Sequence, residues 1–229
     1  MGQMIELQAA DGHHFAAYVA QPAGRAKGAV VVLQEIFGVN AHIQEVADGY
    51  AQAGYVAVAP ATFDRCERGV NLGYKPEDMN AGFALKTAIE ALPAPAVLAD
   101  IQAAVDHAAT VCAGKVGVVG YCWGGLLTWR AACLVKGLSA AVPYYGGGVT
   151  SAAEMARQPL CPVQAHFGTK DHWIALDTVE AFRQAHPHVE VHVYEADHGF
   201  NCNHRAAFDA TAAEQARERA LAFFAAHLG

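Results

Sequence analysis

A cysteine flanked by glycines is the residue whose setting in this chain most plainly suggests chemistry. In "KVGVVGYCWGGLL", residues 115–127, a β-branched run ends at Cys122, which has Gly120 and Gly124 two positions away on either side. Such a turn between a strand and a helix is a nucleophile elbow, in which small flanking residues allow a tight turn that lifts the central side chain above the sheet edge. The helix N-terminus beside the sulfur favours thiolate over thiol. The alternative is a buried, inert cysteine.

Two later strand ends supply an acid and a histidine in the chain order that an elbow nucleophile requires. Asp171 follows one expected strand and His198 follows the last. Asp197 is a poor candidate for orienting His198, because neighbours in an extended segment point to opposite faces. Asp171 is therefore the better acid, although an aspartate here also suits a turn that caps a helix beginning near Ala175.

These three side chains predict acyl transfer. His198 accepts the thiol proton, Asp171 fixes the tautomer of the imidazole, and the thiolate of Cys122 attacks an acyl carbon. The oxyanion that forms needs two convergent donors. The expected donors are the backbone N–H of Trp123, next to the nucleophile, and that of Ile36, in the loop after the earlier strand.

A doubly wound α/β sheet is the fold that would bring these residues to one edge. Continuous apolar runs predict strands buried on both faces, at residues 29–34, 55–59, 115–120, 140–145, 162–167 and 189–194. Helical spacing occurs between them, at residues 41–52, 94–110, 123–136, 176–184 and 206–227. Residues 15–20 are expected to add an antiparallel edge strand. Ligands bind beyond the carboxyl ends of such strands.

Residues 64–91 do not fit the alternation of strand and helix. Aromatic, charged and glycine residues are mixed there between two sheet elements, which is typical of a substrate-facing excursion with a cap helix. A plain surface excursion is the alternative. No linker or repeat divides the chain, so residues 1–229 are expected to form one α/β domain.

Composition narrows the class of partner. The 229 residues are 54% apolar and 16% charged, enough for a large core. The net charge is −7 and no basic run occurs, so we expect neither nucleic acid nor a membrane surface as a partner. A small-molecule substrate and a monomeric state are the expectations that remain.

The start of the chain and its thiols suggest a compartment. "MGQMIELQAADGHH" lacks the basic region and long apolar stretch of a secretory signal. The six cysteines form no C-x-x-C pair, so neither a disulfide framework nor a zinc ribbon is indicated. We expect reduced thiols in a cytoplasmic protein. A metal hydrolase is disfavoured because no H-E-x-x-H spacing occurs.

Several motifs together resemble the dienelactone hydrolase (carboxymethylenebutenolidase) family of the α/β-hydrolase fold. They are "ADGHHFAAYVA", "QEIFGVN", "GYCWGG", "YYGGG", "GTKDHWI" and "ADHGF". The resemblance implies hydrolysis of an ester or lactone through Cys122, Asp171 and His198, with no cofactor and no metal. It also places Glu35 on the family's active-site glutamate, which contacts the resting thiol and moves when substrate arrives. The alternative for Glu35 is a strand-end carboxylate paired with an arginine.

The chain departs from the family where a substrate carboxylate is held. Dienelactone-specific members use one arginine before the cap helix and one shortly after the histidine. Here residues 69–91 contain Lys75 and Lys86 but no arginine, and Cys202 stands four residues after His198, with Arg205 three residues later. A lysine offers a point charge in place of a bidentate fork. The candidate substrate-binding residues are Phe37, Tyr74, Lys86, Tyr145, Trp173, Phe200 and Arg205.

Other functions on the same fold remain open at this stage. A promiscuous short-chain esterase or a thioesterase would use the same machinery. A non-catalytic binding domain is also compatible with the fold, although it would have no reason to retain Cys122, Asp171, His198 and Glu35 together.

Overall fold

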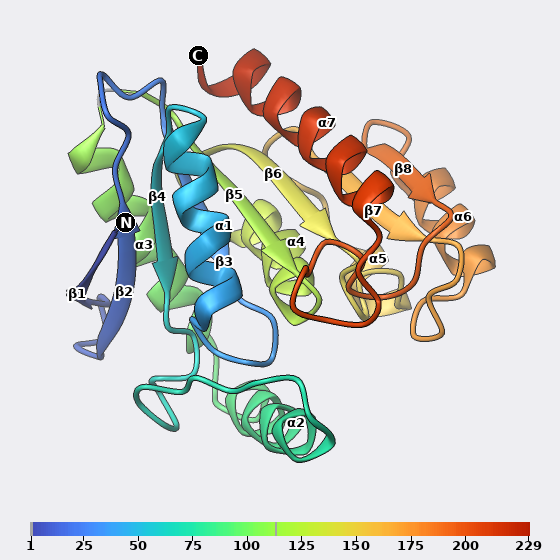
Figure 1. The fold of residues 1–229 in the computed structure, drawn as a ribbon, viewed down its shortest axis with the longest axis horizontal. Coiled ribbons are helices and arrows are strands. Elements are labelled where there is room, and N and C mark those ends of the chain that lie inside the picture. Colours follow the sequence, from blue (N-terminus) through green and yellow to red (C-terminus); the bar gives the residue numbers. More distant parts are fainter. Residues whose placement is uncertain (1, 113) are drawn as a thin grey trace.

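One eight-stranded sheet organises the computed structural model, which describes residues 2–112 and 114–229 (Figure 1). The strand order is β1-β2-β4-β3-β5-β6-β7-β8. The doubly wound α/β sheet predicted from the apolar runs is therefore confirmed. The strands are β1 Gln3–Gln8, β2 His14–Ala20, β3 Ala29–Leu33, β4 Val56–Pro60, β5 Val116–Tyr121, β6 Leu138–Tyr144, β7 Gln164–Gly168 and β8 Glu190–Tyr194.

The antiparallel part of the sheet contains one strand more than the sequence predicted. β2 pairs antiparallel with both β1 and β4, whereas the strands from β4 through β3 to β8 pair in parallel. The prediction that residues 15–20 form the edge was wrong, because β1 lies outside them. β1 alternates exposed and half-buried residues along "QMIELQ", so it lacks the continuous apolar run that marked the buried strands.

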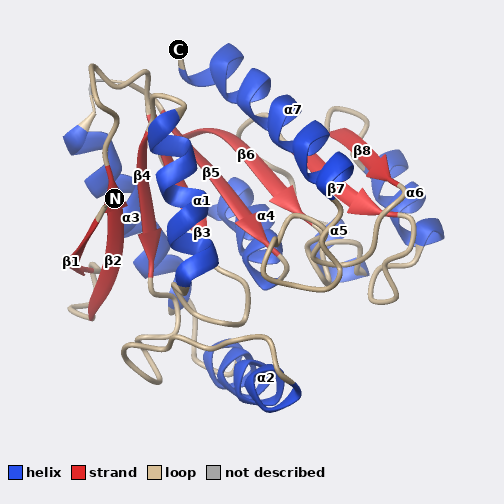
Figure 2. Cartoon of the chain, viewed as in Figure 1, coloured by secondary structure: helices blue, strands red, loops and turns tan. Residues whose placement is uncertain are grey.

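Helices cover both faces of the sheet, and α2 lies beyond the arrowheads of the central strands (Figures 1 and 2). α1 and α7 lie on the near face, and α3 and α4 lie on the other. Each predicted helix is present, although α3 and α7 begin three and four residues later than expected, and the short α5 was not predicted. The helices are α1 Ala41–Gln52, α2 Pro76–Glu90, α3 Val97–Val111, α4 Trp123–Leu134, α5 Ala152–Met155, α6 Leu176–Ala185 and α7 Ala210–Leu228. No helix in the described part of the chain is long and apolar enough to cross a membrane.

The glycines beside Cys122 let α4 begin in direct contact with the sheet. A Cβ on Gly124 would collide with the backbone oxygens of Leu33 and Gln34 at the end of β3. A Cβ on Gly120 would collide with the backbone of Gly124 itself. The tight turn predicted at the elbow therefore depends on close backbone approach at both glycines.

We expect Gly124→Ala to destabilise the protein, because the added methyl meets backbone that cannot move aside. Overpacking of this kind costs about 1–3 kcal/mol, and each kcal/mol lowers the Tm of a domain of this size by about 2–4 °C. Thermal unfolding followed by circular dichroism measures the shift. Gly24→Ala is the matched control, since a Cβ there meets nothing within 4 Å. Equal Tm values for the two variants would contradict the close approach.

Residues 64–91 contain a loop followed by α2, and both ends of this segment are tied to the active-site edge. Before α2, the N–H of Leu72 donates to the carbonyl of Phe37 at 2.9 Å. At the end of α2, Trp123 Nε1 donates to Glu90 Oε1 at 3.1 Å. In between, Gly82 lies so close to the carbonyl of Ile36 that a Cβ would collide with it.

Candidate active site

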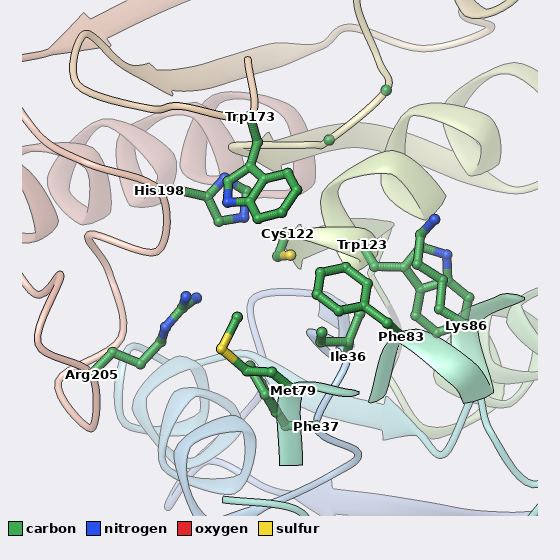
Figure 3. A pocket seen from close by; sticks show the side chains of 12 residues that line it. Ile36, Phe37, Met79, Phe83, Lys86, Cys122, Trp123, Trp173, His198 and Arg205 are labelled. Atoms are coloured by element: carbon green, nitrogen blue, oxygen red, sulfur yellow. The ribbon is translucent and has the colours of Figure 1, made fainter. Parts of the chain in front are cut away.

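Cys122 lies at the point where β5 turns into α4, in the strained conformation that an elbow requires. Its backbone has φ 56° and ψ −115°, a region that non-glycine residues seldom adopt and that costs about 1–3 kcal/mol. The N–H of Cys122 donates to the carbonyl of Tyr144 at 3.1 Å, and the carbonyl of Cys122 accepts from Gly125 at 3.0 Å. These bonds hold the turn, and the half-buried sulfur points into a cavity (Figure 3).

The structure brings His198 and Asp171 together beside Cys122. His198 Nδ1 lies 2.7 Å from Asp171 Oδ2, and the side chain of His198 is hydrogen-bonded to Cys122. Asp171 Oδ1 accepts the N–H of Trp173 at 2.8 Å. Because a carboxylate only accepts, Nδ1 carries the proton and Nε2 faces the sulfur.

Neighbouring contacts distinguish the roles of Asp171 and Asp197. The N-cap residue of α6 is Ala175, and in the first turn the N–H of Thr178 donates to Asp177. Asp171 accepts from Trp173 instead, so it makes a turn without capping α6. Asp197 Oδ1 accepts the backbone N–H of His198 at 2.6 Å. Asp197 therefore holds the backbone beside the imidazole, whereas Asp171 bonds the ring.

Electrostatics at this site favour a charged imidazole. Burial of His198 by itself lowers its pKa, but the negative charge on Cys122 and the hydrogen bond to Asp171 outweigh burial and raise the pKa to about 10. A thiolate and an imidazolium thus stabilise each other. The imidazolium therefore persists through neutral pH, and its charge is lost as pH rises through about 10.

We expect iodoacetamide to label Cys122 at pH 6–7 at least about 100-fold faster than the buried thiols, because the thiolate is the species that reacts. Burial raises the pKa of Cys133 and Cys202 to about 12 and that of Cys161 to about 11. Peptide mass spectrometry over time measures each rate. Cys66 is exposed and serves as the internal comparison for the effect of exposure on the rate. Labelling that simply follows exposure would contradict the ion pair.

The two predicted oxyanion donors lie on adjoining segments at the same edge. Trp123 is the first residue of α4, so its N–H has no acceptor within that helix. Ile36 follows β3, and both residues line the cavity that contains Cys122. Gly82 of α2 packs against the carbonyl of Ile36, on the peptide that follows the Ile36 N–H.

A cavity of about 370 Å³ opens above the sulfur (Figure 3). Of the predicted substrate-binding residues, Phe37, Lys86, Trp173 and Arg205 line it. Met79, Phe83, Gly147 and Gly148 also line it and were not predicted. Met79, Phe83 and Lys86 follow each other at spacings of four and three, so helical periodicity within residues 64–91 was the available signal.

Three predicted substrate-binding residues do not line this cavity. Tyr145 and Phe200 are fully buried and pack on each other, with ring centroids 5.1 Å apart. Tyr145 lies behind His198, with ring centroids 5.1 Å apart, because its backbone adopts φ 35° and turns the side chain inward. Tyr74 packs edge-on against Phe37 and accepts a hydrogen bond from Asn40. These aromatic residues support the site from behind.

Glu35 is paired with an arginine, as in the alternative that the sequence left open. Arg205 Nη1 donates to Glu35 Oε1 at 3.1 Å, and the Glu35 side chain is 1% exposed. Among the described residues no hydrogen bond joins Glu35 to Cys122. The side chain of Cys122 bonds His198 instead. Arg205 thus reaches the cavity from seven residues beyond the histidine, with its guanidinium 5.8 Å from the Phe37 ring.

Comparisons with known proteins identify the family. A sequence model of the Dienelactone hydrolase family matches residues 15–228. Carboxymethylenebutenolidase of Pseudomonas putida is 35% identical over 96% of this chain and 95% of its own length. A Klebsiella pneumoniae protein provisionally named a dienelactone hydrolase has a crystal structure that covers 98% of this chain and 99% of its own, with 33% identity and a TM-score of 0.81. An esterase of Pyrococcus furiosus, at 16% identity over 100% of this chain and 94% of its own, with a TM-score of 0.71, shares the fold alone. The chain has the α/β-hydrolase fold and belongs to the dienelactone hydrolase family.

Proposed function

We propose that this chain hydrolyses carboxylic esters or lactones through Cys122, His198 and Asp171. The observation that supports this most directly is the half-buried sulfur at a strained elbow, hydrogen-bonded to an imidazole that Asp171 orients at 2.7 Å. The cavity above the sulfur supplies room for a small substrate. Family membership supports the same class of reaction.

The reaction proceeds in two halves. The thiolate of Cys122 attacks the carbonyl carbon, and the N–H groups of Ile36 and Trp123 stabilise the oxyanion. His198 then gives its Nε2 proton to the departing alkoxide, which leaves a thioester on Cys122. Water, deprotonated by His198, hydrolyses that thioester and regenerates the thiol. For a lactone, the alkoxide remains tethered to the acyl group.

Glu35 and Arg205 form a charged pair at the edge of the cavity. An incoming substrate carboxylate would compete with Glu35 for the guanidinium, since Arg205 lines the cavity and binds Glu35 through Nη1. We propose that Glu35, once released, moves beside the sulfur, whereas the family resemblance implies a glutamate that contacts the resting thiol and moves when substrate arrives. Through Arg205 and Glu35, binding of an anionic substrate would thus change the electrostatic surroundings of Cys122.

The cavity wall supports an apolar group beside the reacting carbonyl. Phe83 on α2 and Trp173 in the loop after β7 face each other with ring centroids 5.9 Å apart, and both are exposed. Lys86 is the cation on the α2 side of the cavity. We propose a substrate with a planar or apolar portion between the two rings.

We propose further that residues 1–229 act as one monomeric domain on small molecules in the cytoplasm, without a cofactor. The net charge of −7 supports a small-molecule partner over nucleic acid or an anionic membrane surface. All six cysteines are free, which suits a reducing compartment.

Trapping the acyl-enzyme tests the proposal. Mixing with p-nitrophenyl acetate should give a burst of p-nitrophenolate followed by slower turnover, and peptide mass spectrometry should find one acetyl group on Cys122. Parallel turnover of a lactone panel and a thioester, each with and without chelator, separates the lactonase from the thioesterase and esterase alternatives. Absence of turnover on every member, with no acetyl on Cys122, would leave a binding domain on this fold.

A further inference from the structure

Behind the active site, three donor atoms of different chemistry meet in the interior. They are a carboxylate oxygen of Glu35 at the end of β3, a ring nitrogen of His42 in α1 and the sulfur of Cys202 in the loop before α7. All three atoms lie within 4.8 Å of one another, and all three residues are buried. The residues are 1%, 2% and 0% exposed. Neither Cys122 nor His198 belongs to this cluster.

His42 Nε2 and Glu35 Oε2 are hydrogen-bond acceptors to which no group donates in the described structure. Asn203 Nδ2 donates to Glu45 at 3.4 Å, which leaves Asn203 Oδ1 to accept from His42 Nδ1 at 3.1 Å. His42 Nδ1 therefore carries the proton, and Nε2 presents a bare lone pair. His42 Nε2 and Glu35 Oε2 are both buried and without a partner in the described structure. Two buried acceptors without a partner call for a donor or a cation.

The third atom, Cys202 Sγ, is surrounded by donors. The backbone N–H of His204 and the hydroxyl of Tyr74 both hydrogen-bond the sulfur. Asn40 Nδ2 donates to the Tyr74 oxygen at 3.1 Å, so the hydroxyl proton is free to point at the sulfur. Donors of this kind stabilise a thiolate once it is bound to a metal ion.

We propose that Glu35 Oε2, His42 Nε2 and Cys202 Sγ form a binding site for Zn²⁺ or an ion of the same class, separate from the nucleophile. A mixed set of one thiolate, one imidazole and one carboxylate selects zinc-class ions over Mg²⁺ and Ca²⁺, which prefer oxygen ligands alone. The outer contacts match such a site, since the second nitrogen of His42 is bonded to Asn203. Binding forms the Zn–S bond, breaks the S–H bond and releases one proton to solvent.

Occupancy of this site would inhibit the hydrolase, a consequence that rests on the function proposed above. Glu35 is shared, because its Oε1 pairs with Arg205 at 3.1 Å, which leaves the unpartnered Oε2 for the ion. A bound ion holds Glu35 in place, so the carboxylate no longer moves toward the thiol. The ion acts as a reversible inhibitor, and the nucleophile itself stays free.

Direct binding measurements test the site without any need for activity. Cys122→Ala is the background, so that the catalytic thiol cannot contribute. In this background, competition between the protein and a chromophoric chelator should show one Zn²⁺ per chain, and Co²⁺ should give a thiolate charge-transfer band. Adding Cys202→Ser or His42→Gln should remove the bound ion and the band. Tyr74→Phe should weaken binding by about 10-fold, as expected for an outer contact.

Two matched variants in the same background exclude neighbouring ligands. His204→Ala removes a ring from a second cluster, which joins buried His42 to exposed Glu45 and His204, but keeps the backbone N–H that bonds Cys202, so binding should persist. Cys161→Ala removes a thiol elsewhere, and binding should again persist. Circular dichroism and Tm establish that each variant is folded.

The possible results decide the proposal. Folded Cys122→Ala protein that binds no Zn²⁺ overturns it and points to a buried water between Glu35 and His42. Binding that survives Cys202→Ser with an unchanged charge-transfer band also overturns it. In wild-type protein, Zn²⁺ should inhibit turnover reversibly, and Cys202→Ser should raise the inhibitory concentration at least about 10-fold. Equal inhibition of both proteins would place the inhibitory ion on Cys122. Absence of turnover in metal-free wild-type protein would refute the hydrolase function while leaving the binding result intact.

Discussion

Cys122→Ala is expected to lower kcat/KM for p-nitrophenyl acetate by at least about 10⁴-fold, because removal of the nucleophile leaves only the oxyanion hole and the cavity to act on the substrate. The fold should survive the change, since alanine is smaller than cysteine and the half-buried side chain faces the cavity. Steady-state kinetics on an ester and a lactone measure the loss, and an unchanged Tm establishes that the variant is folded.

Cys122→Ser separates nucleophile chemistry from shape. The hydroxyl fits the same space, but it does not ionise beside His198 as a thiol does, so we expect activity to stay far below that of the wild type. In this variant the pKa of His198 should fall, because burial lowers it and the thiolate that raised it is gone. Undiminished hydrolysis by Cys122→Ala would end the proposal that this sulfur is the nucleophile.

Asp171→Asn is expected to reduce kcat by about 10³–10⁴-fold through the wrong histidine tautomer. The amide oxygen of the new side chain should take the N–H of Trp173, which now bonds Asp171 Oδ1 at 2.8 Å. The amide NH₂ then faces His198 Nδ1, so Nδ1 must accept and the proton moves to Nε2. In that tautomer His198 cannot accept the thiol proton.

The pH dependence of the same variant gives a second measurement. Without the carboxylate, one of the causes that raise the pKa of His198 is lost, and the buried ring becomes easier to deprotonate. Iodoacetamide labelling of Cys122 should therefore slow at neutral pH. Asp197→Asn is the matched control, because an asparagine oxygen still accepts the His198 N–H that Asp197 accepts at 2.6 Å. Comparable losses in the two variants would argue against a specific role for Asp171.

Most of the site could be predicted because the sequence shows where the buried strands end. Buried strands have continuous apolar runs, so their ends are visible in the sequence, and Cys122, Asp171 and His198 each follow one. The glycines around Cys122 signalled a turn whose geometry the backbone then imposes. β1 escaped prediction because an edge strand needs only a partly apolar pattern.

The substrate side of the site was predicted less completely, for a physical reason. Aromatic type does not reveal which way a loop residue turns, and the positive φ of Tyr145 sends its ring inward. The pairing of Glu35 with Arg205 depends on a loop that returns across the sheet edge, so sequence spacing alone could not assign it. The cluster of Glu35, His42 and Cys202 joins three elements far apart in the chain, and no local motif marks it.

The attachment of α2 at both ends sets how this enzyme meets substrates of different size. A swing of α2 away from the sheet would break the Trp123–Glu90 bond and pull on the peptide of Ile36, against which Gly82 lies. We therefore expect substrate to enter through an opening that does not depend on movement of α2. The rotamers of Phe83 and Trp173 set the width of this opening. Substituting Phe83 and Trp173 should therefore change the range of substrates that the enzyme accepts without altering the catalytic geometry.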